Sequence, residues 1–389
     1  MSAETVVELC AGAGGLATGI HNAGFRHRLA VDLDGDCCKT LASNWSWDVL
    51  QSDLQTINYS VLNLQPDLLA GGPPCQPFSV AGLHAADSDP RDMFPQVVRA
   101  VREMRPKSFL FENVSGLMRA RFSDYVEYIS LQLQEPELPI KRHELWYEHS
   151  LRLRRASLRS NEGSRLRYTV TRQILNAADF GVPQRRLRVF FVGFREDLGA
   201  RWSFPLATHS EASLLHTKWI TGEYWQRHGL RPRSPTAAQA RAGSNAAQQP
   251  ELLLRAPWQT VRDAVGLLPD PERRPRAAAR FDDHIFVPGA RCYPPGHTGC
   301  LFDEPAKALK AGVNGVGGGE NMLRRQDDKD DSVRYFTFLE MRRIQSFPDA
   351  YIFSGTRSAT TRQLGNAVPP LLAKCIAESI RHALQRVKG

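Results

Sequence analysis

The N-terminal half of the chain alternates short apolar runs with segments whose apolar residues recur at helical spacing. Residues 5–10 are β-branched and apolar, which predicts a buried strand. The segment that follows predicts a helix ending at Gly24. The same alternation predicts strands at residues 28–31 and 49–54, with a helix at residues 35–44 between them. Strands that alternate with helices indicate a parallel sheet covered on both faces.

The alternation continues to the region of residue 197. Residues 91–105 carry apolar side chains at helical spacing, and residues 108–111 and 189–194 form further apolar runs. Polar residues follow several of these strands, and ligands bind beyond the carboxyl ends of the strands in such sheets. We therefore predict an α/β fold, with a doubly wound, mostly parallel sheet and candidate functional residues along one edge.

The second half of the chain has weaker periodicity. Residues 232–250 are rich in Ala, Gln, Ser and Arg, which predicts a flexible insert. Residues 369–387 predict a closing helix with an apolar stripe. We expect two domains, one formed by residues 1–197 plus 356–389 and a smaller one formed by residues 198–355.

The composition indicates a globular protein with a polyanionic partner. Its 389 residues are 42% hydrophobic, enough for a sizeable core, and the formal net charge is +9. Basic residues concentrate in residues 141–172, in residues 227–280 and around Arg185, a distribution that favours nucleic acid. No apolar run approaches the roughly 20 residues of a membrane span, and no secretory signal opens the sequence. We expect a cytoplasmic protein without membrane contact.

The seven cysteines are odd in number and scattered, which predicts reduced thiols rather than a disulfide framework. Cys292, His297 and Cys300 suit a metal by residue type, but no fourth ligand accompanies them. We therefore expect a loop with incidental cysteines and no metal site.

A glycine-rich turn follows the first predicted strand. Residues 12–17 fit the pattern G-x-G-x-x-G/A between a strand and a helix, where glycine lets the backbone approach a ligand closely. Asp32, about 20 positions further on, suits the acid that binds ribose hydroxyls. Dinucleotide oxidoreductases and adenosyl-cofactor enzymes share this pattern, and a tight turn without a ligand has the same sequence.

Residues 71–79, GGPPCQPFS, hold one thiol between prolines. Proline restricts φ and removes a backbone donor, so this turn is rigid, and a rigid turn that displays Cys75 suggests a nucleophile. The alternative is a buried cysteine at a strand end. The residues that follow, with Gly82 among them, predict a loop that closes over the thiol.

Two further segments supply partners for such a nucleophile. Glu112 ends an apolar run, where burial would raise the pKa of its carboxyl group, although a surface glutamate is the alternative. In residues 184–188, QRRLR, a period of two places Gln184, Arg186 and Arg188 on one face. There they are placed to meet an anion or a base edge, unless they are solvated arginines of an edge strand.

The order of these motifs resembles the DNA (cytosine-5) methyltransferase family of bacterial restriction-modification type. The motifs are the glycine-rich loop, the acidic strand ends, Pro-Cys-Gln, Glu-Asn-Val, Gln-x-Arg-x-Arg and a late Gly-Asn. The resemblance covers almost the whole chain except residues 202–279. It implies S-adenosylmethionine as cofactor, duplex DNA as partner and a Rossmann-like methyltransferase fold. It also implies that residues 198–355 form a target-recognition domain.

The resemblance implies a role for each matched residue. Cys75 resembles the nucleophile, Glu112 the acid that engages N3 and the exocyclic amine of cytosine, and Arg188 the arginine on the cytosine carbonyl. Arg186 resembles the residue that supports the catalytic loop. The implied DNA-facing residues are Gln76, Ser79 and Gln184. The implied cofactor-binding residues are Cys10, Ala11, Gly12, Gly14, Gly15, Leu16, Asp32, Leu33, Asp53, Leu54, Pro74, Asn366 and Ala367. The family often has phenylalanine in place of Cys10, so we expect a softer apolar contact with adenine.

The chemistry agrees with this interpretation. Cytosine C5 is a weak nucleophile, and addition of a thiolate at C6 makes it enamine-like. A base inside a duplex cannot reach such a pocket, so we expect base flipping. Methylation of RNA, a nucleotide-dependent oxidoreductase and an inactive DNA-binding module are the alternatives. We further expect a monomer, with a cognate restriction endonuclease as a functional partner.

Overall fold

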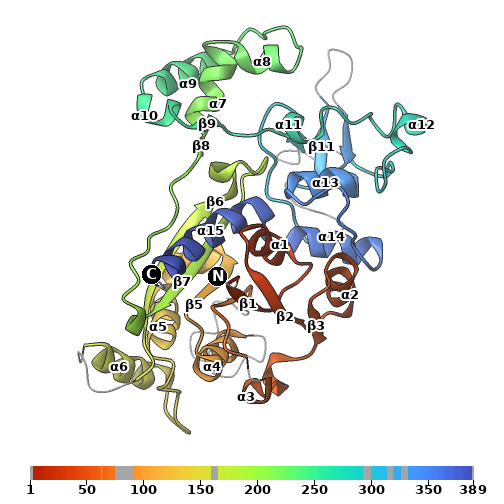
Figure 1. The fold of residues 1–389 in the computed structure, drawn as a ribbon. Helices are drawn as coiled ribbons and strands as arrows, with labels where there is room; N and C mark the ends of the chain where they lie inside the picture. Colours follow the sequence, from red (N-terminus) through yellow and green to blue (C-terminus); the bar gives the residue numbers. More distant parts are fainter. Residues whose placement is uncertain are drawn as a thin grey trace.

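The computed structural model describes residues 3–62, 64–74, 92–158, 165–291, 299–312, 319–325 and 332–387. At its centre is a 7-stranded sheet with the order β3-β2-β1-β4-β5-β7-β6 (Figure 1). The strands are β1 (Thr5–Leu9), β2 (Arg26–Asp32), β3 (Asp48–Gln51), β4 (Leu68–Gly71), β5 (Ser108–Val114), β6 (Tyr168–Asn176) and β7 (Leu187–Arg195). Neighbouring strands from β3 to β5 are parallel, whereas β7 runs antiparallel to both β5 and β6. The prediction of a mostly parallel sheet is confirmed.

The strand order reverses between β1 and β4. The connections that leave these two strands therefore diverge, and a crevice opens at their carboxyl ends. The glycine-rich turn follows β1, and the Pro-Pro segment follows β4. The fold thus brings both predicted motifs to one point of the sheet.

Helices cover both faces of the sheet (Figure 1). One face packs against α3 (Tyr59–Leu62), α4 (Phe94–Met104) and α5 (Ser123–Gln134), through residues such as Val101 and Ile129. The other face packs against α1 (Gly15–Asn22), α2 (Gly35–Asn44) and α15 (Pro370–Arg386), through residues such as Ile20 and Ile376. The predicted closing helix is therefore confirmed as α15, with its apolar stripe in the core.

The sequence pattern did not predict two elements, namely the strand β6 at the edge of the sheet and the helix α6. β6 is the edge strand, and most of its middle residues are exposed, so it lacks the apolar run that marks a buried strand. α6 (Trp146–Ser157) packs on α5 through Tyr128, Leu131 and Leu153. The basic stretch 141–172 thus holds a helix and part of an edge strand.

The remaining elements group around two further apolar clusters. One is built by α7 (Glu211–Trp219), α8 (Glu223–Arg227), α9 (Ala237–Ala247) and α10 (Pro250–Leu253), beside the short pair β8 (His209–Ser210) and β9 (Ala256–Pro257). The other is built by α11 (Val261–Val265), α13 (Phe338–Ile344), α14 (Arg357–Asn366) and the strands β10 (Cys300–Leu301), β11 (Met322–Arg324) and β12 (Val333–Tyr335). α12 (Pro275–Ala278) lies between α11 and β10 in the chain.

The prediction of a flexible insert at residues 232–250 is wrong, because α9 occupies most of it. Thr236 and Gln239 form a reciprocal cap at its N-terminus. Gly243 lies so close to Trp219 that an added Cβ would be 2.9 Å from the Trp219 Cβ. Capping and helix packing stabilise this segment although its composition resembles a linker.

Within the described ranges, no helix is long and apolar enough to cross a membrane. The same ranges contain no group of three or more His, Cys, Asp or Glu side chains able to hold a metal ion. Cys300 is buried in β10, whereas Cys292 and His297 lie outside the described residues.

Candidate active site

Three of the predicted site residues lie outside the described residues, namely Cys75, Gln76 and Ser79. Both ends of their segment are nevertheless placed. The backbone N–H of Met93 donates to the carbonyl of Pro74 at 3.1 Å, and the side-chain amide of Asn113 donates to the carbonyl of Pro73 at 2.9 Å. Residues 75–91 therefore leave and rejoin the described fold at one point, beside the end of β5.

Glu112 lies next to that point and is buried, with 7% of its surface exposed. Its Oε1 accepts a hydrogen bond from Nε of Arg188 at 2.8 Å. A Cβ added to Gly72 would lie 3.3 Å from Oε2 of Glu112 and 3.9 Å from the carbonyl oxygen of Cys10. The carboxyl group, the Pro-Pro segment and the glycine-rich turn therefore converge.

Burial decides the protonation of Glu112. Loss of hydration raises the pKa of its carboxyl group, while Arg188 and Arg186 oppose the shift, and the net result is a raised pKa. The protonated form is thus favoured more than in water, and this form can donate a hydrogen bond.

The register of two strands explains why an acid and a base meet here. β5 and β7 are antiparallel, with Glu112 opposite Phe190 and Val114 opposite Arg188. The carboxyl end of β5 therefore lies beside the start of β7. Arg188 lies two positions along β7 from Phe190, so its side chain is on the same face of the sheet as that of Glu112. At this diagonal position a long side chain can reach the carboxyl group.

The segment before β7 alternates as predicted. Gln184 and Arg186 are buried and Arg188 is partly buried, whereas Arg185 and Leu187 are exposed. The placement of these three polar side chains on one inward face is confirmed.

The expectation that Arg186 supports the loop that carries Cys75 stays a prediction, because that loop lies outside the described residues. Its guanidinium donates to the carbonyl of Leu309 at 3.0 Å and to the carbonyl of Gly365 at 2.6 Å. The side chain is 1% exposed. Arg186 therefore positions α14 and the segment before β11.

Gln184 has no exposed surface, which corrects the expectation that it faces DNA. Its amide donates to Oε1 of Gln345 at 3.1 Å and accepts from the backbone N–H of Leu309 at 2.9 Å. Gln345 in turn donates to the carbonyl of Leu364. The side chain is occupied inside the protein, where it joins the sheet to α13 and α14.

The glycine-rich turn is a tight left-handed bend. Cys10, Gly12 and Gly14 all have positive φ angles, of 49°, 55° and 81°. The backbone N–H of Gly12 donates to Oδ2 of Asp32 at 2.7 Å, and a Cβ on Gly12 would meet nothing within 4 Å. Gly12 thus borders open space, whereas Ala11 is buried against the sheet.

The end of α14 packs directly against the start of α1. A Cβ on Gly15 would lie 2.2 Å from the carbonyl oxygen of Val368 and 3.1 Å from Cβ of Ala367, so only glycine fits. Asn366 is exposed beside this contact, and Ala367 is buried. Leu16 faces the core under α15. The late Gly-Asn motif therefore folds back onto the glycine-rich turn, as predicted.

Acidic residues lie at or just after the carboxyl ends of β2 and β3. Asp32 ends β2, and burial raises the pKa of its carboxyl group although the N–H groups of Gly12 and Asp34 oppose this. Leu33 beside it is 67% exposed, which is unusual for a leucine. Asp53 caps a short 3₁₀ turn through the N–H of Gln55 at 2.9 Å, and Leu54 is buried in that turn.

Cys10 lies between the two acids and the core. Its thiol packs on the apolar cluster of β1 and α4, and burial together with Asp32 and Asp53 raises the thiol pKa. The thiol is therefore protonated near neutral pH, and it presents a soft apolar surface.

These residues fit an adenosyl group. Four features lie along the carboxyl ends of β1, β2 and β3. They are the open approach at Gly12, the Asp32 carboxylate for ribose hydroxyls, the exposed apolar side chain of Leu33 and the second acid, Asp53.

Sequence reasoning missed residues that position this site from behind. Arg99 in α4 donates to the carbonyls of Leu54 and Ile57 at 2.5 and 2.8 Å, and Gln345 links Gln184 to α14. Both act through contacts between segments far apart in sequence. No local spacing signals such contacts.

Comparison with known proteins agrees with this geometry. The family model of C-5 cytosine-specific DNA methylases matches residues 5–138, 160–231 and 303–382, which is more than half of the chain. The gaps in the match contain the whole of α6 and the segment from α9 to β10.

Individual relatives point the same way. The type II methyltransferase M.NaeI of Lentzea aerocolonigenes is 29% identical, over 99% of this chain and 76% of that protein. The type II methyltransferase M.AquIA of Picosynechococcus sp. is 34% identical, over 71% of this chain and 93% of that protein. The Dnmt2 methyltransferase of S. pombe has the same fold, with a TM-score of 0.58 at 16% identity and full coverage of both chains. The chain belongs to the C-5 cytosine-specific DNA methylase family and is a DNA (cytosine-5-)-methyltransferase.

Proposed function

We propose that the enzyme transfers a methyl group from S-adenosylmethionine to C5 of a cytosine in a specific duplex DNA sequence. Cys75 would form a covalent bond to C6 of a cytosine flipped out of the duplex. The observation that carries this proposal is the buried Glu112–Arg188 pair, which lies beside the base of the Cys75 segment and the glycine-rich turn.

The chain's own side chains would prepare the ring for methylation. The Cys75 thiolate attacks C6, and the electron pair of the C5–C6 double bond moves toward N3 and O2. Glu112, whose pKa is raised by burial, donates to N3 in its protonated form and lets the ring accept this charge. Arg188 stabilises the charge at O2. C5 then has the character of an enamine carbon.

Bound S-adenosylmethionine supplies an electrophilic methyl group to C5. Asp32 would hold its ribose hydroxyls, and Asp53 and Leu33 would surround its adenine. After methylation a base removes the C5 proton, the C5–C6 double bond re-forms and the Cys75 thiolate leaves. Arg186, which donates to the carbonyls of Leu309 and Gly365, would keep α14 and Asn366 beside this site during the reaction.

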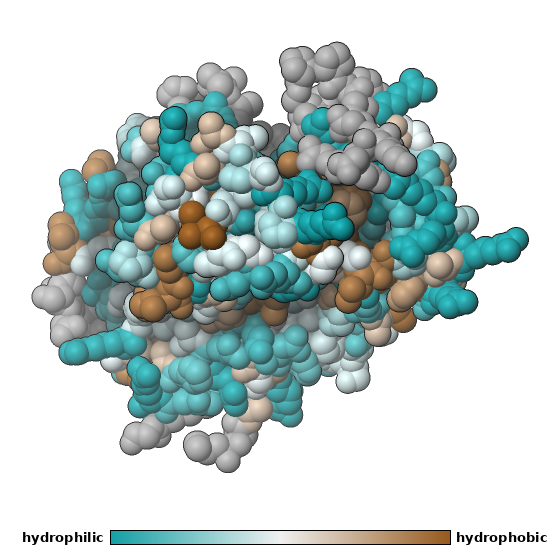
Figure 2. Space-filling view, turned by 90° about the horizontal axis from the view of Figure 1, so that it is seen from above, coloured by the Kyte–Doolittle hydropathy of each residue, from teal (hydrophilic) through white to brown (hydrophobic). Residues whose placement is uncertain are grey.

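Residues 198–355 would supply the sequence recognition. They carry exposed arginines such as Arg231 and Arg241, and the face of the molecule seen in Figure 2 is largely hydrophilic, with scattered hydrophobic patches. Such a surface suits DNA, whose backbone is recognised by cations and whose base edges are recognised by polar groups. The relatives are named type II methyltransferases, so we also propose that a restriction endonuclease acts on the same sequence.

A mechanism-based duplex tests the proposal. Bisulfite sequencing of DNA from cells that express the enzyme first identifies the methylated site. A duplex with 5-fluorocytosine at this position should then form a covalent adduct that survives denaturation, because fluorine at C5 blocks release of Cys75. An adduct that persists in Cys75→Ala, or no adduct with the active wild type, would contradict the mechanism.

Transfer of a labelled methyl group to duplex DNA and to tRNA distinguishes the two nucleic acids. We expect incorporation into DNA that contains the identified site. Incorporation into tRNA alone would overturn the choice of duplex DNA.

A further inference from the structure

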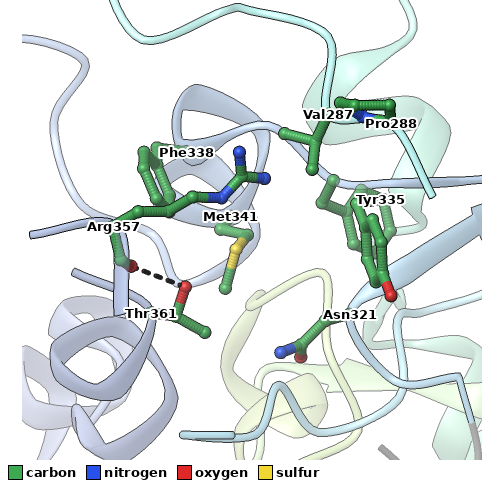
Figure 3. Close-up of a pocket in the computed structure, with 9 residues that line it drawn as sticks. Val287, Pro288, Asn321, Tyr335, Phe338, Met341, Arg357 and Thr361 are labelled. Atoms are coloured by element: carbon green, nitrogen blue, oxygen red, sulfur yellow. Dashed lines mark hydrogen bonds between the residues drawn. The ribbon is translucent and has the colours of Figure 1, made fainter. Parts of the chain in front are cut away.

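A separate pocket lies at the N-terminal end of α14, where β12 and α13 meet it (Figure 3). It holds about 230 Å³. Its apolar wall is formed by Tyr335, Phe338, Met341, Val287 and Pro288. This volume is several times the roughly 30 Å³ that one water occupies in the liquid, so a planar ring has room. It is below the roughly 300 Å³ at which pockets for whole small molecules begin, so it suits one unit of a polymer.

The aromatic side chains are arranged to hold a ring. Figure 3 shows Tyr335 and Phe338 on opposite sides of the opening, with Met341 between them at the back. Both aromatic residues are only partly buried, although each is large and apolar. Aromatic faces that remain accessible on a DNA-modifying enzyme are suited to stacking on a base.

The pocket also presents a cation that forms no ion pair with any described residue. The guanidinium of Arg357 makes no hydrogen bond or ion pair with any described residue, and it lies 5.8 Å from the ring centroid of Phe338. It reaches over the opening in Figure 3. The hydroxyl of Tyr335 likewise has no partner among the described residues. An unpaired guanidinium beside a ring-sized space fits a phosphate attached to a base.

A second basic residue, Lys310, is bound to the pocket wall through its backbone. Asn321, in the pocket wall, holds the backbone N–H and carbonyl of Lys310, each at 3.0 Å. The Lys310 side chain is exposed and, among the described residues, makes no ion pair. Arg357 at the opening and Lys310 on the segment that Asn321 binds are both cations, which complement a DNA backbone.

α14 connects this pocket to the segment that Arg186 binds. It spans Arg357 to Asn366, so its two ends are about 14 Å apart at 1.5 Å per residue. Arg186 binds the carbonyl of Gly365 at its far end. A few nucleotides of a DNA strand span the length of α14, which makes Arg357 a candidate contact for DNA that flanks the target base.

We propose that this pocket is a subsite for one nucleotide of DNA that flanks the target cytosine. Arg357 binds its phosphate, and its unstacked base lies between Tyr335 and Phe338. The inference rests on the proposed function, because it takes DNA as the ligand and Glu112 as the position of the target base.

Photochemical crosslinking tests the position of the base. Duplexes that contain the methylated site carry 5-iodouracil at one flanking position at a time, and the enzyme is irradiated on each duplex with S-adenosylhomocysteine. We expect crosslinks at one position only, mapped by mass spectrometry to Tyr335 or Phe338. If wild-type enzyme methylates the parent duplex but no flanking position crosslinks to either residue, the subsite does not exist.

A charge variant tests the phosphate contact. Arg357→Gln should bind the duplex about tenfold more weakly, with the slope of log K against log salt reduced by about one. Arg386→Gln is the matched control, because Arg386 is exposed at the far end of α15. Equal binding by the two variants would overturn the contact. Both variants should still form the 5-fluorocytosine adduct, so failure of the chemistry is distinguished from failure of the subsite.

Discussion

At the scale of single residues, the protonation of Glu112 results from two opposing effects. Burial disfavours its charge, and the Arg188 guanidinium at 2.8 Å favours it. The net pKa is raised, so burial outweighs the ion pair. Each unit of pKa corresponds to about 1.36 kcal/mol between the two protonation states. A substrate base that displaces Arg188 from Glu112 would remove the opposing effect and favour the acid form further.

Glu112→Gln should therefore change how stability depends on pH. A carboxyl group with a raised folded pKa stabilises the folded state fully below its ordinary pKa of 4.5, and this contribution is lost as pH rises through the folded pKa. Glutamine does not titrate, so the variant does not lose stability in this way. The free energy of unfolding of the variant should therefore rise relative to that of the wild type as pH increases from 4.5. Denaturant unfolding from pH 4.5 to 8 measures the difference.

The control for this prediction is Glu378→Gln, because Glu378 is partly exposed on α15 and, among the described residues, pairs only with Lys374. Its stability profile should run parallel to that of the wild type. A Glu112→Gln profile that is also parallel would contradict the role of burial. Methyl transfer by Glu112→Gln should fall by about 10²- to 10⁴-fold, the usual contribution of a general acid.

At the scale of elements, α4 connects two parts of the site. It begins directly after the segment that contains Cys75, and its Arg99 reaches the turn that follows β3. The guanidinium binds the carbonyls of Leu54 and Ile57 and lies over the Tyr59 ring at 4.8 Å. Arg99 thus holds the turn expected to contact adenine.

Arg99→Lys keeps the charge but loses the two-pronged donor. We expect a loss of about 1–2 kcal/mol in the free energy of unfolding. We also expect weaker binding of S-adenosylhomocysteine by calorimetry, with little change in the rate of methyl transfer at saturating cofactor. Arg102→Lys on the same helix is the control, because Arg102 makes one long hydrogen bond, to Pro136 at 3.3 Å. An equal loss of cofactor affinity in both variants would contradict this role of Arg99, because any arginine-to-lysine change on α4 would then have the same effect.

The same scale shows what the sequence could predict. Buried parallel strands and α15 were predictable, because their apolar residues recur at fixed spacing. β6 was not, because most of its middle residues, Arg172 and Gln173 among them, are exposed, so this edge strand lacks a buried apolar run. α9 was misread because its stability comes from a cap and from packing on Trp219, and neither changes the composition.

At the scale of the whole molecule, buried polar contacts connect the sheet to the elements outside it. Gln184 and Arg186 leave the start of β7 and bind Gln345, Leu309 and the end of α14. The motif that contains both side chains was visible in the sequence, and so was the period that places them on one face. Their partners were not predictable, since they lie more than 120 residues away in the chain.

Arg186→Lys tests whether this connection maintains the site. A lysine ammonium cannot span both carbonyls, so one of them loses its donor while buried, at a cost of about 1–3 kcal/mol. Hydrogen exchange should quicken at the amides of residues 309–312 and 364–366, and methyl transfer should fall because Asn366 is held less firmly. Arg185→Lys is the control, because the neighbouring Arg185 is exposed and pairs with Glu211 at 2.7 Å. Its free energy of unfolding should change by no more than about 0.5 kcal/mol. If exchange quickens equally in both variants, the buried arginine does not hold the two parts together.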